Sequence, residues 1–250
     1  LLRWLKQAPV AEGTAISLMT DYIDQGGFCD WARAEIWAGD AHDALSVVYQ
    51  KLSQQVGRHR DRQNQAFGQQ LATIARGDHL PARLIPVESA LDSLVAPLAE
   101  QGQVLLLVLD GMSEAVYRQL SVDLVRNNWL ELQTVEAQGD ACLVAALPTV
   151  TQVSRCSLLS GVLCEGNAGD EKKAFTGHAQ LKKLASTKFP PLVYHKPDLS
   201  QPGSGSLHSN VRGVIAGKEH RILAVVINAI DDQLSSGSQI KVDWSFETGA

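Results

Sequence analysis

The chain has 250 residues and a mass of 27.0 kDa, which is enough for one large domain or two small ones. Its 45% hydrophobic and 20% charged residues are those of an ordinary globular protein and exclude a mainly disordered chain. The net charge of -5 provides no general attraction for nucleic acid or for an acidic membrane. The sequence also has local basic clusters. We expect the most notable of them, formed by Arg58, His59, Arg60 and Arg62, to be a solvated helix face.

Targeting signals and cysteine spacing indicate the cellular compartment of the protein. The longest strongly apolar run, residues 104–109, is far shorter than the ~20 residues that span a bilayer. No basic segment precedes an apolar stretch at the start, so we expect no signal peptide and a cytoplasmic location. The cysteines show no CxxC spacing, which favours reduced, buried thiols. They are Cys29, Cys142, Cys156 and Cys164.

Residues 1–85 are predicted to form a helical N-terminal region. Apolar residues recur three or four positions apart in the segments 14–25, 30–37, 41–56 and 62–76. We expect Gly26, Gly27, Gly39 and Gly77 to act as turns or C-caps, and Asp30 and Asp40 to be N-caps. Trp31 and Trp37 are interpreted as a packing stripe, and no chemistry is recognisable in this region.

Residues 86–250 are predicted to form an α/β domain. The aliphatic run 104–109 is typical of a strand buried on both faces, and helices are expected at 87–101, 112–126 and 152–160. Three further strands are predicted, at 141–147, 192–195 and 221–227. Strands that alternate with helices favour a mostly parallel sheet flanked by helices.

Three polar groups follow predicted strands, and ligands of open parallel sheets bind at that edge. They are Asp110, the pair Thr149 and Thr151, and the pair Asp231 and Asp232. A carboxylate directly after six aliphatic residues is costly to bury unless it binds a cation or helix N–H groups. Two alternatives need no ligand: Asp110 as the N-cap of the next helix, and the threonines as a helix-capping pair.

Thr151 lies near the start of a predicted helix, where free N–H groups and the helix dipole favour an anion such as phosphate. Its hydroxyl becomes a nucleophile only when a metal or a base activates it. Arg155, one helical turn further on, could point to that phosphate or to solvent.

Other catalytic schemes find no support. GxSxG and HExxH motifs are absent, and residues 213–218 differ from a P-loop in glycine spacing and in the residue that follows the lysine. The later histidines, His178, His195, His208 and His220, are scattered, so we interpret each as a surface or satisfied residue.

Taken together, the stretches 104–113 and 147–161 resemble the PglZ family of bacteriophage-exclusion (BREX) systems, which act in antiviral defence and phage resistance. Residues 190–196, 225–234 and 243–244 strengthen the resemblance, and the residues 30–33 resemble the type 2 systems. The resemblance covers most of the chain.

The PglZ resemblance implies the alkaline phosphatase superfamily and its fold, with two divalent metal ions, zinc or alternatively manganese or magnesium. It implies Thr151 as the nucleophile, Asp110, Asp231 and Asp232 as metal ligands, and Thr149 and Arg155 as substrate-binding residues. The expected function is that of a metal-dependent phosphatase or phosphodiesterase, and a nuclease if the phosphodiester is DNA. Other BREX components are the expected partners, and no membrane is expected.

The family pattern continues with an Asp-His-Gly-His-like metal motif that does not occur before Ala250, and the chain starts without methionine. We therefore expect a piece of a longer protein, with a truncated α/β core, that is inactive alone. Two other functions stay open. One is a catalytically inactive phosphatase-fold scaffold that docks defence components through the N-terminal helices, and the other is a phosphomutase.

Overall fold

The computed structural model describes residues 1–7, 12–37, 39–71, 80–133, 141–199 and 207–236, which divide into two compact units. The first, called the helical unit here, comprises the described residues of 1–83 and 112–140. The second, the sheet unit, comprises those of 84–111 and 141–237. The division into domains at residue 85 stays a prediction.

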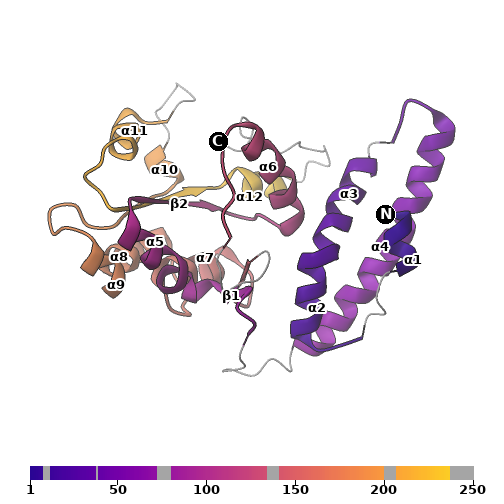
Figure 1. Cartoon of the computed structure of the whole chain (residues 1–250), viewed down its shortest axis with the longest axis horizontal. Coiled ribbons are helices and arrows are strands. Elements are labelled where there is room, and N and C mark those ends of the chain that lie inside the picture. The colour runs from indigo at the N-terminus through magenta and orange to yellow at the C-terminus, as the bar shows by residue number, and fades with distance from the viewer. Residues whose placement is uncertain (8–11, 38, 72–79, 134–140, 200–206, 237–250) are drawn as a thin grey trace. The chain divides into compact units, whose positions relative to one another are not determined.

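The N-terminal region is helical, as predicted (Figure 1). Its segments are α1 (Leu2–Gln7), α2 (Ala15–Asp21), the π-helical turn η1 (Tyr22–Gly26), α3 (Gly27–Trp37) and α4 (Asp43–Leu71), and the unit is completed by α6 (Glu114–Arg126).

Of the glycines expected to act as turns or C-caps, Gly39 does so, because it follows α3 with φ of +80° and its N–H donates to the Ile36 carbonyl at 3.2 Å. Gly26 and Gly27 do not end a helix, and Gly77 lies outside the described residues. The chain stays helical from η1 into α3, and α4 runs unbroken through Gly57, so the two helices predicted at 41–56 and 62–76 are one. Packing explains this. A Cβ at Gly27 would lie 2.3 Å from Glu114 Cγ, and one at Gly57 would lie 3.3 Å from the Arg33 guanidinium carbon. These glycines let neighbouring helices approach closely.

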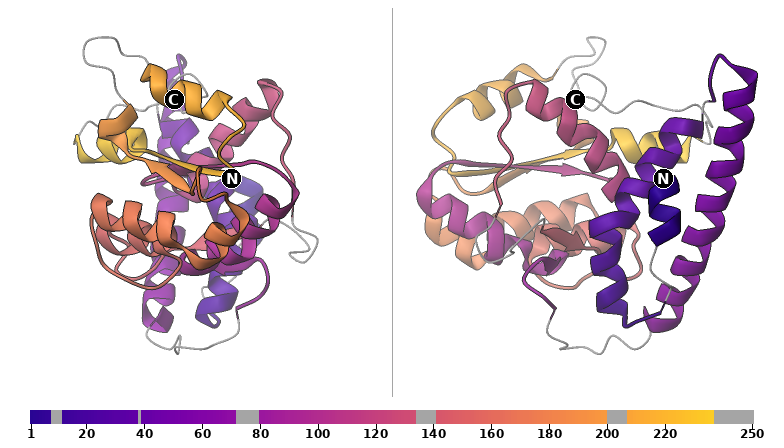
Figure 2. Two further views of the ribbon diagram at one scale, coloured as in Figure 1. Left: turned by 90° about the vertical axis from the view of Figure 1, so that its left-hand side faces the viewer. Right: turned by 45° about the vertical axis from the view of Figure 1, so that its right-hand side comes forward.

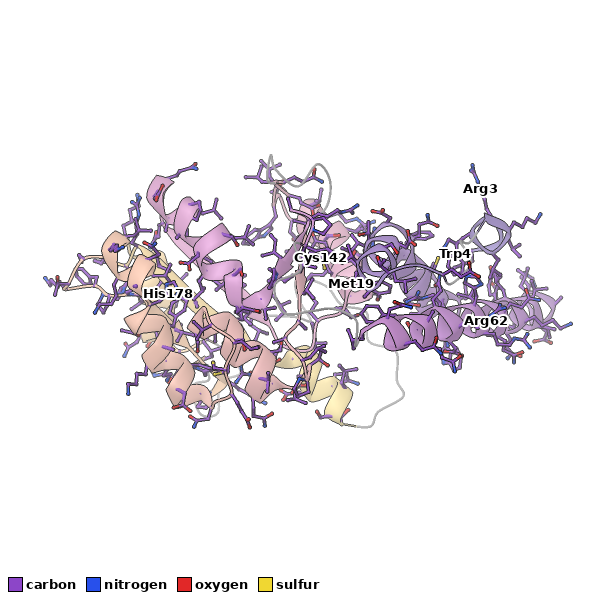
Figure 3. All side chains as sticks on the ribbon, turned by 90° about the horizontal axis from the view of Figure 1, so that it is seen from below. Arg3, Trp4, Met19, Arg62, Cys142 and His178 are labelled. Atoms are coloured by element: carbon purple, nitrogen blue, oxygen red, sulfur yellow. The ribbon has the colours of Figure 1, made fainter. Side chains whose placement is uncertain are left out.

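In the helical unit, the prediction that Asp30 is an N-cap is wrong, and the prediction of a solvated basic helix face holds only in part. Asp30 is not an N-cap, because it lies inside α3 and its carboxylate pairs with Arg60 of α4 at 3.1 Å. Arg60 is consequently buried, whereas Arg58 and Arg62 of the same basic cluster are exposed. His59, also of this cluster, packs edge-on against Trp4 with ring centroids 5.0 Å apart, while Arg3 points away from the unit (Figure 3).

The sheet unit has an α/β arrangement that is mostly helical, with two small parallel sheets. The larger sheet has the order β2-β5-β4, with Val104 opposite Ile222 and Leu192 opposite Leu223. Its strands are β2 (Val104–Leu109), β5 (Ile222–Ile227) and β4 (Leu192–Tyr194), at the positions predicted. The smaller sheet pairs β1 (Leu84–Pro86) with β3 (Cys142–Val144), so the second predicted strand, at 141–147, is shorter than expected and belongs to a different sheet.

Helices cover the larger sheet on two sides (Figures 1 and 2). One layer contains α5 (Ala96–Gln101), α7 (Thr151–Ser160), α8 (Ala168–Gly177) and α9 (Ala179–Leu184), and residues 87–101, predicted as one helix, start as the short turns η2 (Val87–Ser89) and η3 (Leu91–Val95). The other side carries α10 (Lys196–Leu199), α11 (Ser209–Ala216) and α12 (Ala229–Ser235).

The hydrophobic core lies between the larger sheet and the first helical layer. Leu159 of α7, Phe175 of α8 and Leu181 of α9 are buried there against β5 and β4. The central strand β5 is buried on both faces, as its aliphatic sequence indicates. The edge strand β2 is not, because Leu105 and Leu107 are 38% and 40% exposed on the face turned away from this core.

No helix within the described residues is both long enough and apolar enough to cross a membrane. The cysteines among them are free thiols, of which Cys29 and Cys156 are buried and Cys142 and Cys164 are half-buried.

Candidate functional site

Three polar side chains follow directly after the three strands of the larger sheet. Asp110 follows β2, Asn228 follows β5 and His195 follows β4. Asp110 continues the strand pairing, since its backbone N–H donates to the Ile227 carbonyl at 2.9 Å. Asn228 Nδ2 donates to Asp110 Oδ2 at 3.1 Å, so the carboxyl ends of β2 and β5 are joined through side chains as well.

A row of hydrogen-bonded polar side chains runs from Asp110 across two helices to His195, and we call it the buried relay. Arg155 of α7 donates from Nη1 to Asp110 Oδ2 at 2.6 Å and from Nε to Glu171 Oε1 at 3.1 Å. Glu171 of α8 in turn lies 2.5 Å from His195 Nε2 through its Oε2. Glu171 is fully buried and His195 is 4% exposed, so the relay crosses the interior of the unit.

The two carboxylates of the buried relay have opposite pKa shifts. Burial raises the pKa of Asp110 above its usual value, and the nearby Asp231 charge adds to the rise, while Arg155 opposes it. Burial alone would also raise the pKa of Glu171, but hydrogen bonds from His195 and Arg155 outweigh it and the pKa is lowered. Glu171 is therefore held as an anion between two donors, which leaves the buried His195 Nδ1 without a partner among the described residues.

The predicted nucleophile Thr151 is the first residue of α7 and is half-buried. Neither threonine caps this helix through its side chain, because the N-cap is Val150; Thr149 is exposed in the preceding loop. Arg155 is four residues after Thr151, so the two share one face of α7, and Arg155 reaches Asp110. The capping alternative is also wrong for Asp110, since Ser113 caps α6 by accepting from the Val116 N–H.

The predicted ligands Asp231 and Asp232 lie in the first turn of α12 and differ in surroundings. Asp231 is adjacent to the end of β2, because a Cβ at Gly111 would lie 3.2 Å from both the nitrogen and the Cα of Asp231. Gly111 also has φ of +80°, so both its conformation and the close approach require glycine. Asp232 is exposed and binds Lys196 Nζ at 2.6 Å.

The expected metal ions can be tested against these donors. Asp110 and Asp231 fit one end of such a site, because their neighbouring negative charges, which raise the pKa of Asp110, are what a cation would neutralise. Asp232 is ion-paired with Lys196 and Asp110 with Arg155, so each would have to exchange that partner to bind a metal ion. Within the described residues, no group of three His, Cys, Asp or Glu side chains is arranged to hold a metal ion.

Sequence reasoning missed three residues of this edge. Asn228 directly follows one predicted strand and His195 is the last residue of another, so the rule that selected Asp110 could have selected them too. Glu171 had no such signal, because it stands in the charged stretch Asp170-Glu-Lys-Lys173, which is typical of a solvated helix face.

Neither the known protein families nor the curated proteins include a match to this sequence. The function of the site is therefore inferred from its own side chains and from the motifs described above.

Proposed function

We propose that the sheet unit is the phosphate-handling part of a metal-dependent phosphatase or phosphodiesterase of a phage-defence system, with an alkaline-phosphatase-like fold. Thr151 is the nucleophile, and Asp110 and Asp231 contribute to the metal site. The substrate is a phosphate ester, which makes the protein a nuclease if that ester belongs to DNA. The expected partners are other components of the defence system.

The observation that supports this function best is the ion pair of Arg155 with Asp110. It joins α7 to the carboxyl end of β2, the sheet edge that carries Asp110 and Asp231, and Thr151 lies one helical turn before Arg155 on the same face of α7. A hydroxyl, two carboxylates and a helix N-terminus at one edge are the groups that phosphoryl transfer to threonine needs.

Each residue then has a defined task. The first N–H groups of α7, which have no acceptor within the helix, bind the oxygens of a phosphate placed beside Thr151. The Thr151 oxygen attacks phosphorus while the ester P–O bond breaks, the threonine proton ends on the released alcohol, and water then hydrolyses the phosphothreonine. Arg155 keeps the Asp110 carboxylate oriented. Divalent cations, when bound, would lower the pKa of the attacking hydroxyl and neutralise charge on the phosphate.

A catalytically inactive scaffold is the second candidate, and two observations favour it. Arg155 is already neutralised by Asp110 and Glu171, so its charge is not free for a substrate. In the helical unit, Trp37 is 69% exposed, and Val47 and Val48 at the start of α4 are about half exposed. Such apolar side chains are suited to docking another protein.

Hydrolysis assays on the complete protein distinguish the two candidates. A generic phosphomonoester and a generic phosphodiester are each offered with zinc, manganese or a chelator. For the enzyme we expect metal-dependent turnover that falls by a factor of about 10³ or more in Thr151→Ala. Asp110→Asn and Asp231→Asn are expected to weaken zinc or manganese binding in calorimetry as well as turnover.

Two matched controls accompany these variants. Ser93→Ala removes a hydroxyl and Asp61→Asn a carboxylate, each from an exposed position outside the site, and both should keep full turnover. Absence of turnover with every metal, together with intact phage resistance in Thr151→Ala, would reject the enzyme in favour of the scaffold.

A further inference from the structure

A positively charged stretch in the sheet unit stands apart from the acidic balance of the chain. Between Glu171 and Asp198 the sequence contains six lysines and no acidic residue, although the whole chain has a net charge of -5. The stretch covers most of α8, all of α9 and β4, and α8 and α9 lie side by side (Figure 1). Positive charge is thus concentrated on one part of a unit rather than spread over it.

Three of these lysines line a cleft of about 730 Å³ between α8, α9 and the loop that leads into β4. On α8, Gly169, Lys172, Lys173 and Thr176 are spaced three, one and three residues apart, so they form one face of the helix. Lys182 of α9 lies across the cleft, and the hydroxyl residues Ser186 and Thr187 belong to the loop. No acidic residue lines it.

Two of the three lysines in the cleft form no ion pair among the described residues. Lys172 binds Asp198 at 2.6 Å, but neither Lys173 nor Lys182 has a carboxylate partner among the described residues. Lys172 and Lys173 lie in the second turn of α8, beyond the reach of the dipole at either helix end, so the helix gains nothing from their charge. Side-chain ammonium groups facing one cleft repel each other, and an anion between them would relieve that repulsion.

We propose that this cleft binds a ligand with two or more phosphate groups. Lysine acts on phosphate as a point charge, the hydroxyls of Ser186 and Thr187 add directional hydrogen bonds, and the volume is that of a nucleotide-sized ligand. Phosphates of this kind occur in free nucleotides and in a nucleic-acid backbone. The cleft lies on α8 and α9, outside the set of residues assigned to hydrolysis, so the proposal does not depend on that reaction.

Binding measurements on the complete protein test it, with a chelator present so that metal ions do not contribute. The probes are pyrophosphate, measured by calorimetry, and a fluorescent single-stranded DNA oligonucleotide, measured by anisotropy at several salt concentrations. The test variant is Lys173→Glu with Lys182→Glu. The control is Lys51→Glu with Lys218→Glu, which has the same net charge but reverses exposed lysines elsewhere.

We expect at least one probe to bind, the test variant to weaken binding tenfold or more, and the control to change it less than twofold. Removal of two phosphate contacts should also lower the salt dependence of oligonucleotide binding by about 1.4 in the logarithmic slope, at about 0.7 for each contact with a single strand. Pyrophosphate binding would identify a free nucleotide as the ligand, and binding of the oligonucleotide alone would identify a nucleic-acid backbone. Equal weakening in both variants, or no binding of either probe at low salt, would overturn the proposal.

A separate observation concerns two of the free thiols. Cys156 Sγ of α7 lies 3.3 Å from Cys164 Sγ in the loop that follows this helix, and the Ser157 hydroxyl bonds both the N–H and the carbonyl of Cys164. The backbone therefore already holds the two sulfurs close to bonding position. We propose that these cysteines are a modification site at which a hydroperoxide forms an intramolecular disulfide.

The oxidation has two balanced steps. The half-buried Cys164 thiol reacts first, giving a sulfenic acid and releasing water from hydrogen peroxide. Cys156 Sγ then attacks that sulfur, the S–S bond forms, and a second water leaves. Burial raises the pKa of the Cys156 thiol to about 11, so little of it is thiolate at neutral pH and this second step is the slower one.

Mass spectrometry reads out this reaction in one peptide, because trypsin cuts after Arg155 and Lys172 and leaves both cysteines between the cuts. After treatment with hydrogen peroxide we expect the peptide to lose two hydrogens and to resist alkylation until a reductant is added. Cys164→Ser should abolish this change, and Cys142→Ser should leave it intact. Cys164 oxidised to sulfinic acid beside an intact Cys156 thiol, or a peptide unchanged by the oxidant, would contradict the proposal.

Discussion

In the helical unit, buried and half-buried charged side chains pair at separate points, whereas in the sheet unit the buried ones form one row. Arg60 meets Asp30 between α3 and α4, and Arg118 binds Glu114 within α6. The sheet unit instead surrounds the buried relay with an aliphatic core. Apolar burial and close packing stabilise the sheet unit, so its buried charges are the exception that calls for an explanation.

The comparison teaches that the same kind of contact has different consequences in the two units. Asp30 is 30% exposed at its side chain, so water screens its ion pair and can replace it. Glu171 is fully buried, so water cannot replace either of its partners. The Arg60–Asp30 and Arg155–Glu171 ion pairs are both 3.1 Å long, but removal of Glu171 should cost more folding stability than removal of Asp30.

The largest effect is expected from Glu171→Ala. It leaves the Arg155 guanidinium and His195 buried without their shared carboxylate, which should lower the free energy of unfolding by about 3–5 kcal/mol. Urea unfolding followed by circular dichroism measures this. Glu165→Ala, an exposed glutamate of the same unit, is the control and should change little. Equal stabilities for the two variants would mean that the buried relay is not part of the stable core.

The pH dependence of stability should also reveal the role of Glu171. The pKa of Glu171 is lowered in the folded chain, so its contribution to stability is fully present above its unfolded pKa of about 4.3 and is lost as the pH falls through the folded value. We expect the wild-type chain to lose stability steeply below about pH 4. Glu171→Gln should show a shallower acid dependence in unfolding measured across the acid range. Parallel pH profiles for the two proteins would show that Glu171 is not the titrating group.

A smaller effect is expected from Asp30→Ala in the helical unit. Arg60 keeps its hydrogen bond to Gln63 and its contact with the Tyr22 ring, so the loss should be about 1–2 kcal/mol. Every tryptophan among the described residues belongs to this unit, which makes tryptophan fluorescence the suitable probe. Asp61→Ala, exposed on the same helix as Arg60, should have no effect. A loss as large as that of Glu171→Ala would remove the contrast between the units.

The smallest effects come from two glycines of the helical unit, and they should differ in sign. A Cβ at Gly68 in α4 meets nothing within 4 Å, so Gly68→Ala should stabilise the chain by about 0.5–1 kcal/mol. Gly27→Ala should destabilise it, because the new methyl group would displace Glu114. Thermal unfolding detects both shifts, and stabilisation by both substitutions would show that α3 and α6 are not closely packed.

Sequence patterns alone determined the positions of β2 and β5, because long aliphatic runs have few other places in a folded chain, and they also located the short strand β4. They also determined that Asp110 and Asp231 follow strands, since this needs only the strand ends. The candidate site was predictable to that extent.

Only the tertiary structure decided what those side chains contact. Local sequence did not reveal that Glu171 is buried, because its partners Arg155 and His195 come from a different helix and from the end of a strand. The prediction of a turn at Gly27 was wrong for a similar reason. The side chain that requires a glycine there is Glu114, which belongs to α6. Spacing along the chain determines which residues share an element, but burial and pairing depend on which elements meet.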